Sequence, residues 1–382
     1  MRPPAARPRA TGRRAADGVR REAHGHGLLA QPPPAPRRRG GVRVLVLGAT
    51  GYVGSRLVPH LVERGHEVVA ASRSVPDPDR FGWDDRVRAI SCDVTDPAAV
   101  AEAMEGAEAV VYLVHSLDRT DFSDRDRWAA QTVAEAATGV HHLVYLSGLV
   151  PDVPETQLSA HIASRLEVER ILLGATDRAV ALRAGVVLGA GSTSYEIVRQ
   201  IATLFLVQPV PTWMHSSVQP VAVSDVLRAF DDALVGRLSG AVDIGGPDVL
   251  PYPDLMRACA REAGLPRLRV PAPVAPAGLV GIATALATTA PFHTVTALIE
   301  SLRHDMVCRP EHTWTPTTGG PLLGVEEAVG RASTPRYAGP EGALPSDPSW
   351  TRPHPLLDVV PLPASGRAAA RLALHRLRSL LG

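Results

Sequence analysis

Aromatic residues and cysteine are scarce in this 382-residue chain, and lysine is absent. Aromatic residues make up only 4% of it, which disfavours the stacking platforms that bind single-stranded nucleic acids. The three cysteines, Cys92, Cys259 and Cys308, are far apart and form no C-x-x-C pair, so neither a disulfide framework nor a zinc site is expected. We therefore expect no nucleic-acid partner, no metal and a reducing, cytoplasmic location.

Long hydrophobic runs are also missing. The first residues contain no continuous apolar segment, which disfavours a secretory signal. The proline-free apolar run 277–290 has fourteen residues, whereas a membrane span needs roughly twenty. We therefore expect no transmembrane span and interpret this run as a buried helix, with a membrane-associated segment as the alternative.

The two ends of the chain differ in composition from its middle. Residues 1–40 are rich in proline and glycine and hold ten arginines against two acidic residues, so we expect a disordered basic tail there. Residues 331–382 are expected to form a Pro-rich linker and a C-terminal amphipathic helix, Gly366–Leu381. That helix could pack on its own domain, on a second subunit or, as a peripheral contact, on a membrane surface.

The most informative segment is a strand-like run followed by a glycine pattern. The apolar run Val42–Leu47 ends at three glycines, Gly48, Gly51 and Gly54, spaced G-x-x-G-x-x-G, and an amphipathic stretch follows them. Strand, tight turn and helix in this order are the context in which such glycines bind a dinucleotide. Gly48 permits the turn, Gly51 lets backbone amides approach a pyrophosphate, and Gly54 lets the helix pack closely on the strand. The alternative is a glycine-rich turn that binds no ligand.

Alternating strand and helix patterns follow, which are typical of a doubly wound parallel α/β sheet. Further strands are expected at 67–73, 87–92, 109–114, 142–147 and 179–184, and helices at 97–105, 124–138 and 159–173. We expect a Rossmann domain over residues 41–190 with a returning segment, 221–247. Residues 191–220 and 248–330 would form a smaller, mainly helical substrate lobe. Asp96 and Asp225 are each expected to cap the helix that follows them.

The end of the second expected strand indicates which cofactor is used. Proteins that bind NAD commonly carry an acidic residue there, but this chain has Ser72 and Arg73. A guanidinium group can bind a ribose 2′-phosphate through charge-assisted hydrogen bonds, so NADP(H) is favoured over NAD(H). The alternative is that Arg73 lies in solvent at the strand end. Asp93 and Val94 are expected on the adenine side.

With the glycine motif, Cys92–Asp96 and Tyr112–Ser116 in this order, the chain resembles the atypical and extended short-chain dehydrogenases/reductases. Residues 42–300 are most similar to the NmrA-like or complex I accessory subunit-like NAD(P)H-binding proteins. The resemblance implies a Rossmann fold whose loops after the fourth and fifth strands line the cofactor. The residues expected to contact the cofactor are Gly48, Thr50, Gly51, Tyr52, Val53, Gly54, Ser72, Arg73, Asp93, Val94, Val114, His115 and Leu146.

Active members of the broader family use a Tyr-x-x-x-Lys pair on the helix after the fifth strand. At the matching positions this chain carries His161 and Arg165, which a spacing of four places on one helix face. His161 could donate a proton, although the neighbouring guanidinium would lower its pKa. Arg165 could bind the ribose hydroxyls, and Ser147 or His115 could replace the missing tyrosine. The alternative for Ser147 is a hydroxyl that caps a buried strand.

The resemblance implies an NAD(P)H-dependent oxidoreductase that transfers a hydride to or from a small organic substrate, as a monomer or a homodimer. Candidate substrate contacts are Trp213, Met214, His215 and Gln219, with core packing as the alternative for the tryptophan and the methionine. Because the Tyr-x-x-x-Lys pair is missing, a non-catalytic redox sensor or assembly subunit is a second hypothesis. A sugar-nucleotide epimerase is a third.

Overall fold

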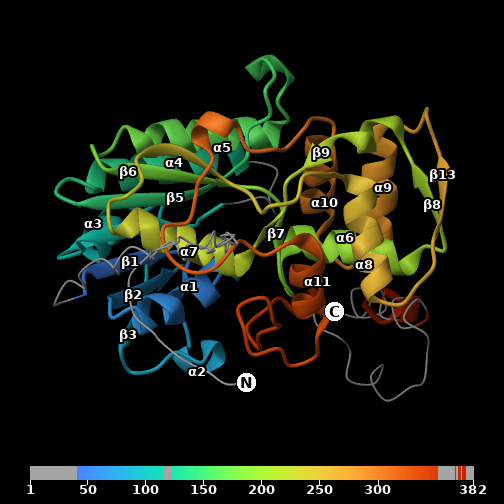
Figure 1. Cartoon of the computed structure of the whole chain (residues 1–382). Helices are drawn as coiled ribbons and strands as arrows, with labels where there is room; N and C mark the ends of the chain where they lie inside the picture. Colours follow the sequence, from blue (N-terminus) through green and yellow to red (C-terminus); the bar gives the residue numbers. More distant parts are fainter. Residues whose placement is uncertain (1–40, 116–121, 352–365, 367–368, 371, 376–382) are drawn as a thin grey trace, which may run out of the picture. The chain divides into compact units, whose positions relative to one another are not determined.

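The computed structural model describes residues 41–115, 122–351, 366, 369–370 and 372–375 (Figure 1). The predicted basic tail lies outside the described residues, as does most of the predicted C-terminal helix. None of the helices in the described part of the chain has the length and apolar character that a membrane span requires.

A seven-stranded sheet carries the N-terminal part of the fold. Its order is β11-β6-β5-β4-β1-β2-β3, and every pair of neighbouring strands is parallel. The strands are β1 (Arg43–Leu47), β2 (Glu67–Ser72), β3 (Val87–Ser91), β4 (Ala109–Tyr112), β5 (His142–Gly148), β6 (Ala179–Ala184) and β11 (Gly240–Ile244). This confirms the predicted doubly wound α/β fold, and β1 to β6 begin and end within two residues of the strands predicted for them.

Helices cover both faces of this sheet (Figure 1). The helices of this part are α1 (Tyr52–Glu63), α2 (Pro78–Phe81), α3 (Pro97–Met104), α4 (Phe122–Ala136), α5 (Ala160–Leu173) and α7 (Val223–Leu234). Val44 and Val46 of β1 share a core with α1 and α7, whereas Leu45 and Leu47 share the other core with α3, α4 and α5. Because successive side chains of a strand point to opposite faces, both faces are buried and the strand is apolar throughout.

Local capping explains two of these helix starts, and one predicted cap is wrong. The Asp96 carboxylate accepts the backbone N–H groups of Ala98 and Ala99, as predicted for α3. The Ser159 hydroxyl accepts the N–H of Ile162 at the start of α5. Asp225 does not cap α7, because it lies inside that helix and its oxygens accept from the Arg228 guanidinium and the backbone of Leu323.

A second, smaller group of elements forms a lobe beside the carboxyl ends of the strands (Figure 1). Its helices are α6 (Thr193–Leu204), α8 (Tyr252–Glu262), α9 (Ala277–Ala287), α10 (Phe292–Ser301) and α11 (Val325–Ser333). Its short strands are β7 (Val187–Leu188) with β10 (Val221–Ala222), β9 (Ser217–Val218) with β12 (Leu250–Pro251), and β8 (Val207–Val210) with β13 (Leu268–Pro271). Short 3-10 helices span Glu155–Gln157, Thr212–His215, Pro310–His312 and Ser349–Thr351.

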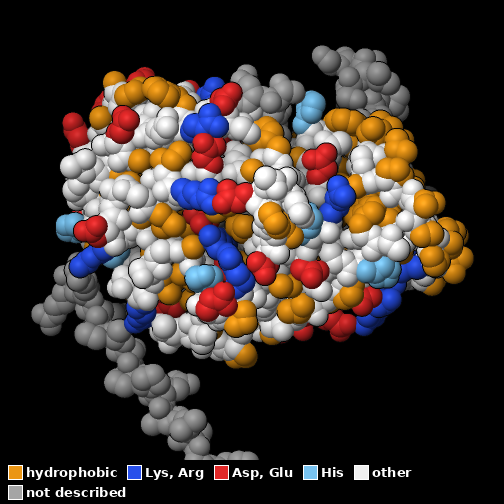
Figure 2. Space-filling model, turned by 90° about the horizontal axis from the view of Figure 1, so that it is seen from above, with side chains coloured by type: hydrophobic (Ala, Val, Ile, Leu, Met, Phe, Trp, Pro, Cys, Tyr) orange, Lys and Arg blue, Asp and Glu red, His pale blue; other side chains and the backbone are white. Residues whose placement is uncertain are grey.

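The lobe also carries exposed apolar side chains. Leu279, Ile282 and Leu286 of α9 and Leu268 of β13 are between 44% and 64% exposed. Figure 2 shows hydrophobic side chains gathered at that end of the molecule. The prediction that the run 277–290 is a buried helix is therefore wrong in part: the helix covers Ala277–Ala287, and one of its faces lies in solvent.

The segment after α11 packs against the start of the Rossmann domain. Arg56 of α1 is 3% exposed and donates to both carboxylate oxygens of Asp347, at 2.8 and 3.0 Å. The same guanidinium donates to the carbonyls of Pro340, Gly342 and Ala190. Residues 340–347, predicted as part of a Pro-rich linker, are thus held by a buried ion pair on the helix that follows the glycine motif.

Candidate cofactor and substrate site

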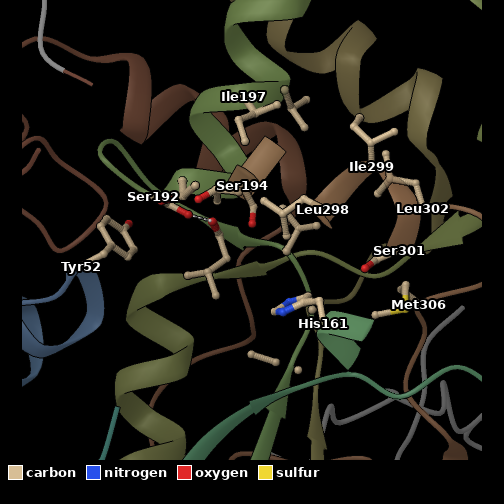
Figure 3. A pocket seen from close by; sticks show the side chains of 18 of the residues that line it. Tyr52, His161, Ser192, Ser194, Ile197, Leu298, Ile299, Ser301, Leu302 and Met306 are labelled. Carbon is tan, nitrogen blue, oxygen red and sulfur yellow. Dashed lines mark hydrogen bonds between the residues drawn. The ribbon is translucent and has the colours of Figure 1, made fainter. Parts of the chain in front are cut away.

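A cavity of about 750 Å³ lies at the carboxyl ends of the parallel strands and extends into the lobe (Figure 3). Its walls include the glycine-rich turn, the ends of β5 and β6, the first turns of α5, and residues of α6 and α10. Ligands of open α/β folds bind in this position, outside the carboxyl ends of the strands.

The glycine-rich turn has the shape that a pyrophosphate requires. Gly48 adopts a φ of +85°, which favours glycine, and its N–H donates to the carbonyl of Ala71. A Cβ atom on Gly54 would lie 2.5 Å from the Gly48 carbonyl oxygen, so only glycine fits there. Helix α1 starts directly after Gly51 with no acidic residue in its first turn, which leaves its N-terminal amides and partial positive charge toward the cavity.

The end of β2 provides a cation and no carboxylate. Arg73 is exposed and lines the cavity. The neighbouring Ser72 hydroxyl donates to the carbonyl of Ser74. Asp93 lies across from this strand end, where the backbone N–H and hydroxyl of Thr95 bind its carboxylate and lower its pKa. The charge of Arg73 contributes to the lowered pKa of Asp93, so the two side chains lie near each other.

The first turns of α5 bring His161 and Arg165 to the cavity wall. Burial lowers the pKa of His161 to about 3, with further lowering by the charge of Arg165 and by His115. Arg165 donates to the carbonyl of Leu146 at 3.0 Å, which holds its guanidinium across the end of β5. Ser147, buried at the same strand end, also lines the cavity. The predicted catalytic residues therefore lie around one space, and His161 is neutral near pH 7.

The structure brings together some of the predicted contacts and separates others. Of the predicted residues, those that line the cavity are Gly48, Gly51, Tyr52, Val53, Gly54, Arg73, His115, Leu146, Ser147, His161, Arg165 and Met214. The predicted residues that are not among its described lining are Thr50, Ser72, Asp93, Val94, Val114, Trp213, His215 and Gln219. The Gln219 amide instead joins two loops, because it donates to the Gly246 carbonyl and accepts from the Cys308 N–H. The Trp213 indole donates to the Ala275 carbonyl.

Sequence reasoning missed most of the lobe side of the cavity. The apolar residues there come from α6, α8, α10 and later loops: Ile197, Val198, Ile201, Met256, Leu298, Ile299, Leu302, Met306 and Trp350. Pairs at a spacing of four, such as Ile197 with Ile201, do appear in the sequence as helical apolar faces. That signal is the same for a helix packed in a core and a helix that lines a cavity, so it could not identify these residues as a site.

Comparisons with known proteins agree with this geometry. Residues 48–199 match the model of the NAD(P)H-binding family. A 3-diazoavenalumate denitrifying reductase of a Streptomyces species is 28% identical over 65% of this chain and 91% of its own length. An uncharacterized protein of Mycobacterium tuberculosis is 28% identical over 61% of this chain. The matched region covers only 24% of the length of that relative.

The fold is also found among solved structures. The Bordetella bronchiseptica enzyme WbmG, solved in complex with NAD and UDP, superposes with a TM-score of 0.52 at 20% identity, over 63% of this chain and 84% of WbmG. The glycine-rich turn, the parallel sheet and the family match all point to a nicotinamide cofactor. The chain is therefore similar to NAD(P)H-binding proteins over residues 48–199 and shares its fold with WbmG.

Proposed function

We propose that this protein is an NADP(H)-dependent oxidoreductase acting on an organic substrate in the lobe. The observation that supports this most strongly is the continuity of the cavity, whose wall includes the glycine-rich turn, the His161–Arg165 face of α5 and the lobe helices. A dinucleotide bound along the strand ends would thus have its nicotinamide beside the space for a second molecule.

Three groups of this chain would hold the cofactor. The amides at the start of α1 bind the pyrophosphate, and Arg73 binds the 2′-phosphate. Arg165, held by the Leu146 carbonyl, binds the nicotinamide ribose. A guanidinium offers only hydrogen-bond donors, so the role of Arg165 is to orient the cofactor and not to exchange protons.

Bound NADPH would supply the hydride. His161 is neutral near pH 7, because its pKa is lowered to about 3, and so it acts as a hydrogen-bond donor to the substrate oxygen. Its N–H would polarise the substrate carbonyl toward the hydride that bound NADPH supplies, and solvent would provide the proton that the oxygen takes up. Ser147 lies beside the same space and orients the substrate.

A redox sensor is the second candidate. The positions of the family's tyrosine and lysine hold His161 and Arg165, and the lowered pKa of His161 leaves its proton-donating imidazolium form almost unpopulated near pH 7. Such a sensor would bind NADPH and NADP⁺ without consuming either. The relative that matches along most of its length is a reductase, which favours the enzyme.

The test is a thermal-shift titration with NADPH, NADP⁺, NADH and NAD⁺. A ligand at a hundredfold excess over its Kd stabilises the native state by about 2.7 kcal/mol. We expect shifts with the phosphorylated cofactors that shrink in Arg73→Ala, since a charge-assisted contact is worth about tenfold to a hundredfold in affinity. The matched control is Arg88→Ala, an exposed arginine of the neighbouring strand β3 that is not part of the described cavity lining.

The absence of a shift with all four cofactors would refute the proposal. Preference for the unphosphorylated pair would refute the role of Arg73. NADPH oxidation, followed at 340 nm with a panel of carbonyl compounds, then separates the enzyme from the sensor. Consumption with one compound identifies an enzyme, and binding without consumption across the panel favours the sensor.

A further inference from the structure

The lobe part of the cavity is lined mainly by hydrocarbon (Figure 3). Ile197 of α6, Leu298 of α10 and Leu302, the residue after α10, point into it together with Met306. Ile201 of α6 also lines it. These side chains come from segments about one hundred residues apart in the chain. Apolar walls of this kind gain free energy by removing apolar ligand surface from water.

Permanent charge is confined to the other end of the cavity. Among the described residues that line it, the arginines are Arg73, just after β2, and Arg165, on α5 beside the end of β5, and no aspartate or glutamate lines it. The nearby lobe arginines have other partners. Arg199 is paired with Glu196, and Arg267 donates to the carbonyls of Ala202 and Thr203.

A sugar nucleotide would be poorly accommodated here. Its diphosphate carries at least two negative charges and its sugar several hydroxyl groups, all of which need polar partners once buried. The two arginines of the cavity are those that the proposed function assigns to the cofactor. Among the described lining residues a second diphosphate would therefore find no further arginine, only apolar groups and neutral hydroxyl groups such as those of Ser192, Ser194 and Ser301.

Strand β8 lies at the far side of the lobe from the sheet (Figure 1), and its Gln208 is a polar residue of the cavity lining. It is 1% exposed, and its Nε2 donates to the Ala202 carbonyl at 3.1 Å. Its Oε1 is buried and has no hydrogen-bond partner among the described residues. A buried carbonyl oxygen of this kind is costly unless a ligand donates to it.

From these observations we infer that the substrate is a large, uncharged, mainly apolar molecule with a hydroxyl or N–H group at the end that reaches Gln208. This inference rests on the proposed function, because it takes the lobe cavity to be the substrate site of that reaction. It removes the sugar-nucleotide epimerase from the set of functions, since that substrate is charged.

The test uses the full chain saturated with NADP⁺ and the uncharged dye Nile red, whose emission shifts to the blue in apolar surroundings. We expect the dye to bind, 2-undecanone to displace it, and UDP-glucose not to displace it. Val198→Asp places a carboxylate on the cavity wall and should weaken dye binding about tenfold or more. Leu279→Asp is the matched control, because Leu279 is 64% exposed on the outer side of α9.

Two further variants cover the case in which Val198→Asp does not fold. Ala283→Trp adds bulk from the exposed rim of the cavity and should also weaken dye binding several-fold. Gln208→Leu should weaken displacement by 1-undecanol, which can donate a hydrogen bond, about two- to tenfold, and leave displacement by 2-undecanone unchanged. The NADP⁺ thermal shift reports whether each variant is folded.

Three results would overturn the inference. The first is displacement of the dye by UDP-glucose, and the second is loss of dye binding in Leu279→Asp but not in the cavity variants. The third is a normal NADP⁺ shift in wild type without dye binding, which refutes the apolar substrate while the proposed function stands. A missing NADP⁺ shift would refute the proposed function and, with it, the substrate role of the cavity.

Discussion

Replacing Asp347 with asparagine tests how strongly the C-terminal segment is tied to the cofactor helix. Both oxygens of the Asp347 carboxylate bind the Arg56 guanidinium, and Oδ2 also accepts the N–H of Leu344 at 2.7 Å. Both side chains are buried, at 2% and 1% exposure. The variant therefore leaves a buried cation without its anion while keeping the shape of the side chain.

Removing one partner of a buried ion pair costs about 3–5 kcal/mol. Asparagine keeps one acceptor oxygen, and Arg56 keeps its hydrogen bonds to the carbonyls of Pro340, Gly342 and Ala190. We therefore expect the free energy of unfolding to fall by about 3 kcal/mol, the low end of this range. Urea unfolding followed by tryptophan fluorescence measures it, with Trp350 three residues from the substitution. The midpoint should fall while the slope stays constant.

The control is Glu155→Gln, which breaks the exposed pair between Glu155 and Arg170. Solvent screens exposed ion pairs, so the urea midpoint of Glu155→Gln should match that of the wild type. If Asp347→Asn lowers the free energy of unfolding by less than about 1 kcal/mol, the ion pair adds little beyond the carbonyl contacts of Arg56. That result would refute the reasoning, which expects a large cost for a buried cation without its anion. A double variant, Arg56→Met with Asp347→Leu, should recover part of the loss, because it removes both charges together.

Three further predictions concern the cofactor end of the cavity. Gly54→Ala should abolish the NADPH thermal shift, because the new Cβ would lie 2.5 Å from the Gly48 carbonyl oxygen. The control Gly278→Ala should keep the shift, because a Cβ there meets nothing within 4 Å. Arg165→Met should weaken the binding of NADPH and of NADH equally, by about tenfold. Arg170→Met, which replaces an exposed arginine on the same helix, should leave the binding of both unchanged. An unequal loss of affinity in Arg165→Met would contradict its contact with the ribose. The pKa of His161 is about 3 in the folded protein against 6.5 ordinarily, so the unfolded chain binds the proton more readily. Stability is therefore complete above pH 6.5 and falls as the pH drops toward 3, by up to about 1.4 kcal/mol per pH unit. His161→Gln should flatten this slope in urea titrations at several pH values, and an unchanged slope would mean that other groups produce it.

Much of the Rossmann part could be predicted from the sequence, because its signals are local. A buried parallel strand must be apolar on both faces, so the run Val42–Leu47 identified β1 almost to the residue. The cap formed by Asp96 depends on two neighbouring amides and was also predicted correctly. Gly48 and Gly54 are required by backbone geometry within a few residues of each other.

The remainder depends on contacts between distant segments. The sequence predicts that Asp225 caps a helix, but its partners include Leu323, which lies 98 residues away. Gln219 is a plausible substrate contact in the sequence, yet Cys308 and Gly246 use its amide to join loops. The lobe walls also depend on contacts between distant segments, since the apolar faces of α6 and α10 form a cavity only once both helices are packed.

The pairing of Arg56 with Asp347 also has a consequence for synthesis. The two residues are 291 positions apart, so at roughly 5–20 residues per second a ribosome needs roughly 15–60 s to produce the second after the first. During that interval the helix that carries the glycine motif has a cation with no carboxylate to bury it. Until residues 340–347 have been made, the Arg56 guanidinium therefore lacks four of the acceptor oxygens that surround it in the folded protein.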